Sequence, residues 1–223
     1  MHIGLIGGIG PAATDFYYQG LIKRAAAKGV DMDLTMVHAD SPTLLANLQA
    51  DDKATQSEIY MRLTERLAQA GAACVVITSV SGHFPIDVFQ PKSPLPVIDI
   101  MATLRAHLAD SGLKRVGIMG TRPAMASAMF GKLGALDVIA PAGDALNRVH
   151  DAYVELAVSG QPTNALRSVF FEEGATLVRD AGAEAVLLGG TDLNVAFEGH
   201  DPGFALVDCA DIHVDEVAKR LSL

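Results

Sequence analysis

Cysteine is scarce in this chain of 223 residues, which contains only Cys74 and Cys209. Two cysteines are too few for a disulfide framework or a cysteine-rich metal site, so we expect a reduced, cytoplasmic setting and no bound metal. Basic residues are also in the minority, because 17 Lys and Arg face 26 Asp and Glu and leave a net charge of −9. Proteins that bind nucleic acid or an anionic membrane surface need basic patches, so we expect neither partner.

Long hydrophobic runs are missing as well, and none approaches the roughly 20 residues of a membrane-spanning helix. The opening Met-His-Ile-Gly-Leu-Ile-Gly-Gly lacks a basic region and passes directly into a strand pattern, which is not typical of a signal peptide. Half of the sequence is nevertheless hydrophobic and only 19% is charged, so it is suited to forming a sizeable core.

Several common motifs are also absent. The chain has no Gly-Lys-Ser/Thr triplet, which excludes a P-loop. The turn at 7–11 approximates a dinucleotide-binding turn, but no acidic residue ends the second strand about 20 residues later, so no nucleotide cofactor is expected. The main-chain N–H groups of Gly8 and Ile9 are still suited to hold a small carboxylate. The segment 79–83 is not Gly-x-Ser-x-Gly, so a nucleophile elbow is unsupported.

Short apolar strands alternate with helical stretches along the whole chain. Strands are expected at 2–6, 33–38, 74–78, 97–100, 116–119, 137–140, 185–188 and 206–209. Helices are expected at about 12–28, 53–70, 101–111, 124–133, 145–158 and 164–180. Because the strands are apolar throughout, they indicate parallel sheets that are covered by helices on both faces.

Three landmarks recur in order at offsets of about 110 residues, which indicates an internal duplication. They are a Gly-rich first turn, an Ala-Gly-Ala strand entry and a Val/Ile-Asp strand. The sequence therefore predicts an α/β protein of two pseudo-symmetric halves, 1–112 and 113–223, with the terminal helix allowed to cross over. A ligand cleft is expected between the halves, since open α/β sheets bind ligands beyond the carboxyl ends of their strands.

The candidate site follows from aligning the two Ala-Gly-Ala triplets, which places Ser79 opposite Gly190. The loop from Ser79 to His83 suits contact with a ligand, and it equally suits the start of a short helix. Asp192 in the second loop suits a helix cap, a general base or a group that orients another residue. Asp40 and Thr121 end other strands on the same inferred edge.

Three segments resemble the aspartate/glutamate racemase superfamily, and the resemblance extends over essentially the whole chain. Gly7-Gly8-Ile9-Gly10-Pro11-Ala12-Ala13-Thr14 stands where the family has Gly-Gly-Met-Gly-Pro-x-Ala-Thr. Ser79-Val80-Ser81-Gly82-His83 stands in place of Cys-Asn-Thr-x-His, and Gly189-Gly190-Thr191-Asp192 in place of Gly-Cys-Thr-Glu. The resemblance implies an isomerase that racemises a small amino acid without a cofactor, and it implies a homodimer.

The resemblance also implies that two cysteines act on opposite faces of the substrate's α-carbon, because a thiol ionises readily near neutral pH. Both thiols are absent here, since Ser79 and Gly190 stand at the two positions. Three hypotheses remain open. In the first, the chain is an isomerase whose acid and base are Asp192, His83 or Ser79. In the second, it is a binding protein for a small carboxylate or amino acid. In the third, it is a lyase such as a decarboxylase. The expected substrate contacts are Gly8, Ile9, Asp40, Val80, Ser81, Thr121 and Thr191.

Overall fold

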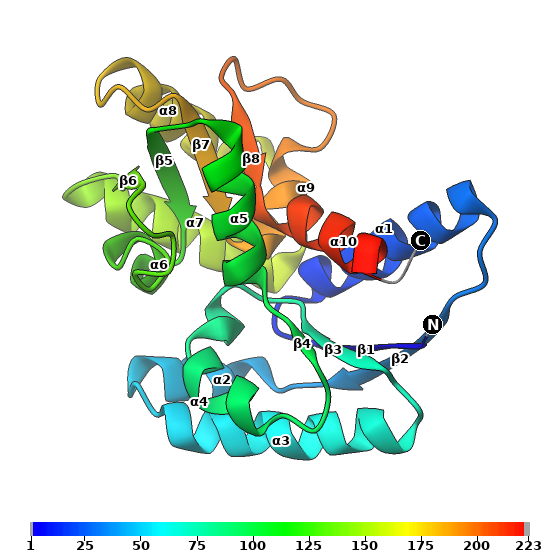
Figure 1. The fold of residues 1–223 in the computed structure, drawn as a ribbon. Coiled ribbons are helices and arrows are strands. Elements are labelled where there is room, and N and C mark those ends of the chain that lie inside the picture. The colour runs from blue at the N-terminus through cyan, green and yellow to red at the C-terminus, as the bar shows by residue number, and fades with distance from the viewer. Residues whose placement is uncertain (1, 221–223) are drawn as a thin grey trace. The chain divides into compact units, whose positions relative to one another are not determined.

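Every strand in the computed structural model, which describes residues 2–220, runs parallel to its sheet neighbours (Figure 1). The strands form two four-stranded sheets, ordered β2-β1-β3-β4 and β6-β5-β7-β8. Their bounds are β1 His2–Gly7, β2 Asp33–His38, β3 Cys74–Ile77, β4 Val97–Ile98, β5 Arg115–Gly120, β6 Asp137–Ile139, β7 Ala185–Gly189 and β8 Leu206–Asp208. Both sheets have the same strand order, as expected for a duplicated sequence, and the expected α/β fold with two parallel sheets is confirmed.

Helices and short helical turns connect the strands. The helices are α1 Pro11–Lys28, α2 Ser41–Gln49, α3 Lys53–Gln69, α4 Ile86–Phe89, α5 Ile100–Ser111, α6 Arg122–Ala126, α7 Asp144–Ser159, α8 Asn164–Arg179, α9 Asn194–Phe197 and α10 Cys209–Arg220. Single 3₁₀ turns lie at Ser81–His83, Gln90–Lys92 and Thr191–Leu193. Two of these turns, Ser81–His83 and Thr191–Leu193, overlap the candidate loops that follow β3 and β7.

The chain divides into two compact units, which we describe separately. Unit 1 runs to Ile100 and resumes at His213, and unit 2 runs from Met101 to Ile212. The chain therefore changes units at the start of α5 and again inside α10. We propose that the boundary between residues 112 and 113 marks the sequence repeat rather than the edge of a compact unit.

Burial explains why the central strands are apolar along their whole length. In unit 1, α3 covers one face of the sheet, and α1 with the C-terminal part of α10 covers the other (Figure 1). The central strands β1, β3, β5 and β7 are buried almost throughout, whereas the edge strands β2 and β6 are partly exposed. A strand covered on both faces has no polar side to show in its sequence.

One expected helix was wrong in its extent, and one helix was not expected. The helix expected at 124–133 ends at Ala126, because the Ser127 hydroxyl bonds back to the Pro123 carbonyl and the next residues adopt left-handed conformations. The segment Asp40-Ser41-Pro42 follows the end of β2 and also starts α2, a helix that the sequence pattern did not predict. Asp40 caps this helix, and Pro42 fits its first turn, where a missing N–H costs no hydrogen bond.

Within residues 2–220, no helix combines the length and the apolar character that crossing a membrane would require.

Candidate active site

Each unit gathers its own set of polar groups where its strands end. In unit 1, the Thr14 and Thr78 hydroxyls lie 3.2 Å apart and join the loop after β1 to the end of β3. Ser41 donates its hydroxyl to the Gly8 carbonyl over 2.5 Å and joins the same loop to the start of α2. Three neighbouring strand ends of unit 1 therefore carry the catalytic candidate Ser79 and the expected contacts Gly8, Ile9, Asp40, Val80 and Ser81.

The glycine loop leaves two N–H groups at the start of α1. Gly8 and Gly10 have φ angles of 91° and 90°, which favour glycine, and Gly8 donates its N–H to the Thr14 hydroxyl at 2.9 Å. Among residues 2–220, no acceptor bonds the N–H of Ile9 or Gly10, and no side chain caps α1. Both groups lie at the positive end of an 18-residue helix, a setting that favours an anion such as a carboxylate.

Ser79 follows β3 and organises the turn behind it. Its hydroxyl oxygen accepts the Gly82 N–H at 3.1 Å, and its carbonyl accepts the Nδ1–H of His83 at 2.6 Å. The hydroxyl therefore supports the 3₁₀ turn at Ser81–His83, much as a capping residue does. Ser79, Val80 and Ser81 are all buried.

His83 is bonded to the main chain through both ring nitrogens. Nδ1 donates to Ser79, so Nε2 is the acceptor for the Ile100 N–H at 3.4 Å. Burial is the main influence on His83 and lowers its pKa. Two groups raise this pKa in part: the Asp99 carboxylate, 3.9 Å from Nε2, and the hydrogen bond to Ser79. The imidazole is therefore neutral near pH 7, and both of its nitrogens hold the loop in place.

His213 is a second buried histidine of unit 1. Its Nε2 donates to the Ile98 carbonyl at 2.9 Å, and its Nδ1 accepts the Tyr17 hydroxyl at 2.6 Å. These bonds tie α10 to β4 and α1, so His213 has a structural role. Burial is the main reason that the pKa of His213 falls to about 3.

This buried histidine predicts acid sensitivity. The unfolded chain binds a proton to His213 below about pH 6.5, whereas the folded chain does so only near pH 3. Stability is therefore full above the unfolded pKa and is lost as the pH falls. Between pH 7 and pH 5, His213 alone is expected to lower the free energy of unfolding by about 2 kcal/mol, measurable by urea unfolding.

The matched comparison replaces each of two histidines by glutamine. His213→Gln should flatten the dependence of stability on pH, and His107→Gln, at an exposed position of α5, should leave it unchanged. An equal slope in wild type and His213→Gln would contradict the prediction.

Unit 2 gathers Thr121, Thr191, Asp192 and Gly190 on neighbouring strand ends, since Gly120 pairs with Gly189. The Thr121 hydroxyl caps α6 by accepting the Ala124 N–H at 3.4 Å. Beside it, His150 Nδ1 accepts the Arg122 N–H at 3.1 Å, and burial together with Arg122 lowers the pKa of His150.

Gly190 has no room for a side chain, because Tyr153 fills the space. A Cβ atom at residue 190 would lie 2.3 Å from a Tyr153 ring carbon and 2.8 Å from the phenol oxygen. The φ angle of Gly190 is −153°, which any residue adopts, so the restriction is steric. A ring from α7 thus stands where the resemblance places a cysteine side chain.

Tyr153 and Asp192 form a buried acid–base pair. The phenol donates to Asp192 Oδ2 at 3.1 Å, and both residues are less than one tenth exposed. Burial, with the charge of Asp192, holds the pKa of Tyr153 well above its usual range, so the phenol stays protonated. Burial and the Asp208 and Asp192 carboxylates also raise the pKa of Cys209, which is therefore a thiol.

Sequence reasoning gave no role to Tyr153, the residue that defines the unit 2 site. Tyr153 lies 37 residues before Gly190, so no local sequence pattern could have connected them. The two residues come into contact only because α7 packs on the loop after β7. Among residues 2–220, no three His, Cys, Asp or Glu side chains gather as metal ligands.

Comparison with known proteins matches the family described as Asp/Glu/Hydantoin racemase to residues 6–217. A Yersinia pestis structure described as an Asp/Glu racemase shares 20% identity, with a TM-score of 0.85 over 100% of this chain and 99% of that one. An aspartate racemase homologue from Pyrococcus horikoshii shares 22%, with a TM-score of 0.82 over 100% and 99%. Glutamate racemase from Francisella tularensis, in complex with D-glutamate, shares 18%, with a TM-score of 0.67 over 99% and 80%.

Proposed function

We propose that this chain, which belongs to the Asp/Glu/hydantoin racemase family, removes and returns a proton at the α-carbon of a small amino or carboxylic acid without a cofactor. Asp192 is the proposed base, and Tyr153 is the neutral donor that positions its carboxylate. A glutamate racemase of similar fold is named as a complex with D-glutamate, which supports an amino acid as the ligand class. Gly8, Ile9, Asp40, Val80, Ser81, Thr121 and Thr191 stay predicted ligand contacts.

One observation carries this proposal. The Tyr153 ring occupies the side-chain space of residue 190, and its phenol bonds the carboxylate two residues further along the chain. The loop that would carry a thiol therefore presents an oxygen acid–base pair. A carboxylate accepts a proton without a cofactor, and a fixed phenol donor reduces the reorganisation that each transfer requires.

Neither catalytic candidate of unit 1 is a comparable base, since both nitrogens of His83 are bonded and Ser79 is a hydroxyl in a turn. Ser79 and His83 stay predictions as catalytic residues. If Asp192 both takes and returns the proton, the α-carbon exchanges hydrogen on one face only. The expected result is exchange with retention of configuration rather than racemisation.

The test is proton NMR in D₂O with a panel of single-enantiomer amino acids and small carboxylic acids. We expect protein-dependent loss of one α-proton signal, while chiral chromatography shows that the enantiomer persists. Appearance of the opposite enantiomer at the rate of exchange would instead show a second base. Absence of exchange with every candidate would contradict the proposal.

The second candidate function is binding without turnover, and the loop after β1 favours it. The Ile9 and Gly10 N–H groups suit a carboxylate even in a chain that transfers no proton. A thermal-shift screen with the same acids should then show stabilisation at millimolar ligand although no α-proton exchanges. No stabilisation by any acid would count against this function.

We also propose that the chain acts as a homodimer in the cytoplasm. Light scattering coupled to size-exclusion chromatography tests the oligomeric state, and a mass of about 23 kDa would indicate a monomer.

A further inference from the structure

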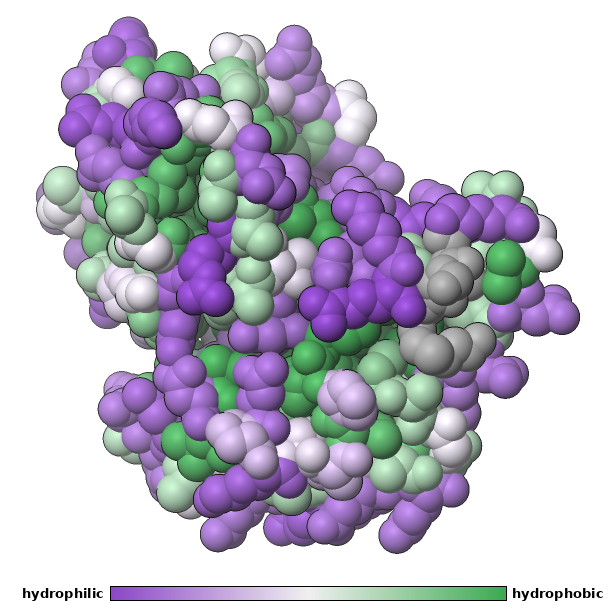
Figure 2. Space-filling view, in the orientation of Figure 1, coloured by the Kyte–Doolittle hydropathy of each residue, from purple (hydrophilic) through white to green (hydrophobic). Residues whose placement is uncertain are grey.

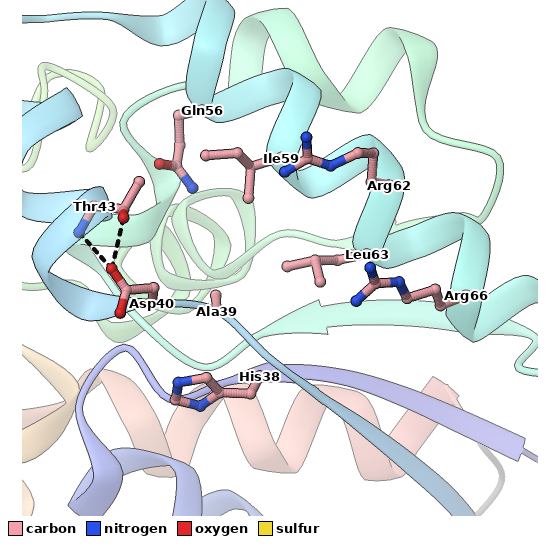
Figure 3. Close-up of a pocket in the computed structure, with 9 residues that line it drawn as sticks. All are labelled: His38, Ala39, Asp40, Thr43, Gln56, Ile59, Arg62, Leu63 and Arg66. Carbon is pink, nitrogen blue, oxygen red and sulfur yellow. Dashed lines mark hydrogen bonds between the residues drawn. The ribbon is translucent and has the colours of Figure 1, made fainter.

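A hollow at the edge of the first sheet is distinct from the loops that follow β1 and β3. It has a volume of about 250 Å³ and lies beside the end of β2, between α3 and the start of α2 (Figure 3). Its lining residues are His38, Ala39, Asp40, Thr43, Gln56, Ile59, Arg62, Leu63 and Arg66. Asp40 is the one lining residue that is also a predicted ligand contact of the proposed function, and neither Asp192 nor Tyr153 lines the hollow.

Opposite charges share this hollow without pairing. Arg62 and Arg66 extend from successive turns of α3 with their guanidinium groups turned toward it, and Asp40 lies on the facing side (Figure 3). Within residues 2–220, no ion pair joins Asp40 to either arginine, or either arginine to any other acid. The hollow therefore has a positive side and a negative side.

Asp40 is fixed on the negative side. Its Oδ2 accepts the Thr43 N–H at 2.9 Å and the Thr43 hydroxyl at 2.6 Å. These two bonds lower the pKa of Asp40, which keeps the carboxylate ionised. In the described part of the chain Oδ1 accepts no hydrogen bond, so one oxygen remains for a ligand.

Apolar side chains complete the hollow. Ala39 and Leu63 are buried, and Ile59 is half-buried beside them, whereas the charged groups are exposed. A ligand with charges at both ends and a short carbon chain between them would match this arrangement. Exposed charge pairs are individually weak, so recognition depends on satisfying both sides at once.

We propose that this hollow binds a small zwitterion that carries a carboxylate and an ammonium group. The carboxylate lies against Arg62 and Arg66, whose planar guanidinium groups fit carboxylate oxygens, and the ammonium donates to Asp40 Oδ1. A simple anion is attracted by the two arginines but repelled by the carboxylate of Asp40. A simple cation is attracted by Asp40 but repelled by the arginines, so neither half of the ligand is sufficient.

The experiment is a titration of the ¹⁵N-labelled full chain, followed by its amide NMR signals. The probes are glycine and β-alanine as zwitterions, and acetate and ethylammonium as their halves. We expect at least one zwitterion to cause saturable shifts at the residues that line the hollow. Acetate and ethylammonium should each bind more weakly than that zwitterion, by roughly fivefold or more. Acetate that binds as tightly as both zwitterions, or no saturable shift at these residues, would overturn the proposal.

Single variants locate the two ends of the ligand. Arg62→Gln and Arg66→Gln should each weaken zwitterion binding about threefold or more, and Arg105→Gln, an exposed arginine on α5, should not change it. Asp40→Asn keeps an acceptor for the α2 cap and should abolish the preference for the zwitterion over acetate. Unchanged binding in all three hollow variants would overturn the proposal. Shifts confined to 190–192 would instead report the site of the proposed function.

Discussion

Gly190→Ala is expected to lower the free energy of unfolding by about 1 to 3 kcal/mol, although it adds a single methyl group. The new Cβ would lie 2.3 Å from the Tyr153 ring, and that ring is buried and cannot swing freely into solvent. The backbone angles of Gly190 suit alanine, and alanine reduces the entropy of the unfolded chain, so the loss is due to steric overlap. Urea unfolding measures the change.

A double-mutant cycle supplies the control. Tyr153→Ala removes the ring and is itself destabilising, by about 3 to 5 kcal/mol for a large buried aromatic residue. In that background Gly190→Ala should be neutral or stabilising, because the methyl group enters the vacated space. If Gly190→Ala costs the same with and without the ring, steric overlap with Tyr153 is not the cause.

The same geometry affects any attempt to restore two thiols. Ser79→Cys and Gly190→Cys would supply the two thiols that the resemblance implies, but a cysteine at 190 carries the same Cβ into the Tyr153 ring. We therefore expect the two substitutions to reduce stability unless Tyr153 is also replaced by a small residue. The lack of a side chain at residue 190 and the position of the Tyr153 ring are therefore linked by packing in this structure.

Asp192→Asn is expected to slow α-proton exchange by about 100-fold or more, because it removes the only proposed base and leaves the shape of the side chain nearly unchanged. The amide oxygen of asparagine can still accept the Tyr153 hydroxyl, so the loop should keep its fold. The measurement is the rate of α-proton loss in D₂O with the best substrate of the panel. Persistence of exchange in this variant would exclude Asp192 as the base.

Two further variants separate the base from its surroundings. Asp201→Asn makes the same change on an exposed loop of unit 2 and should leave the rate unchanged. Tyr153→Phe keeps the ring that fills the space at Gly190 but removes the donor to Asp192. We expect about a tenfold loss of rate, the order of a lost hydrogen bond to a charged group.

The sequence predicted the strands and long helices well, because their signals are local. An unbroken apolar run such as the one in β7 indicates a strand covered on both faces, and the repeat of three landmarks predicted two sheets of one design. Short elements were harder. The helix α2 was not predicted, since Asp40, Ser41 and Pro42 are typical of a turn and also of a helix start.

The site shows the same limit more sharply. The sequence by itself determined which residues end the strands, and the resemblance to the racemase family implied that Ser79 and Gly190 stand at two cysteine positions. Only the tertiary structure decided that Tyr153 fills the space beside Gly190, and that Arg62 and Asp40 face one hollow from different elements. The physical reason is that side-chain packing and charge act between atoms that are close in space, and their separation along the chain does not reveal that closeness.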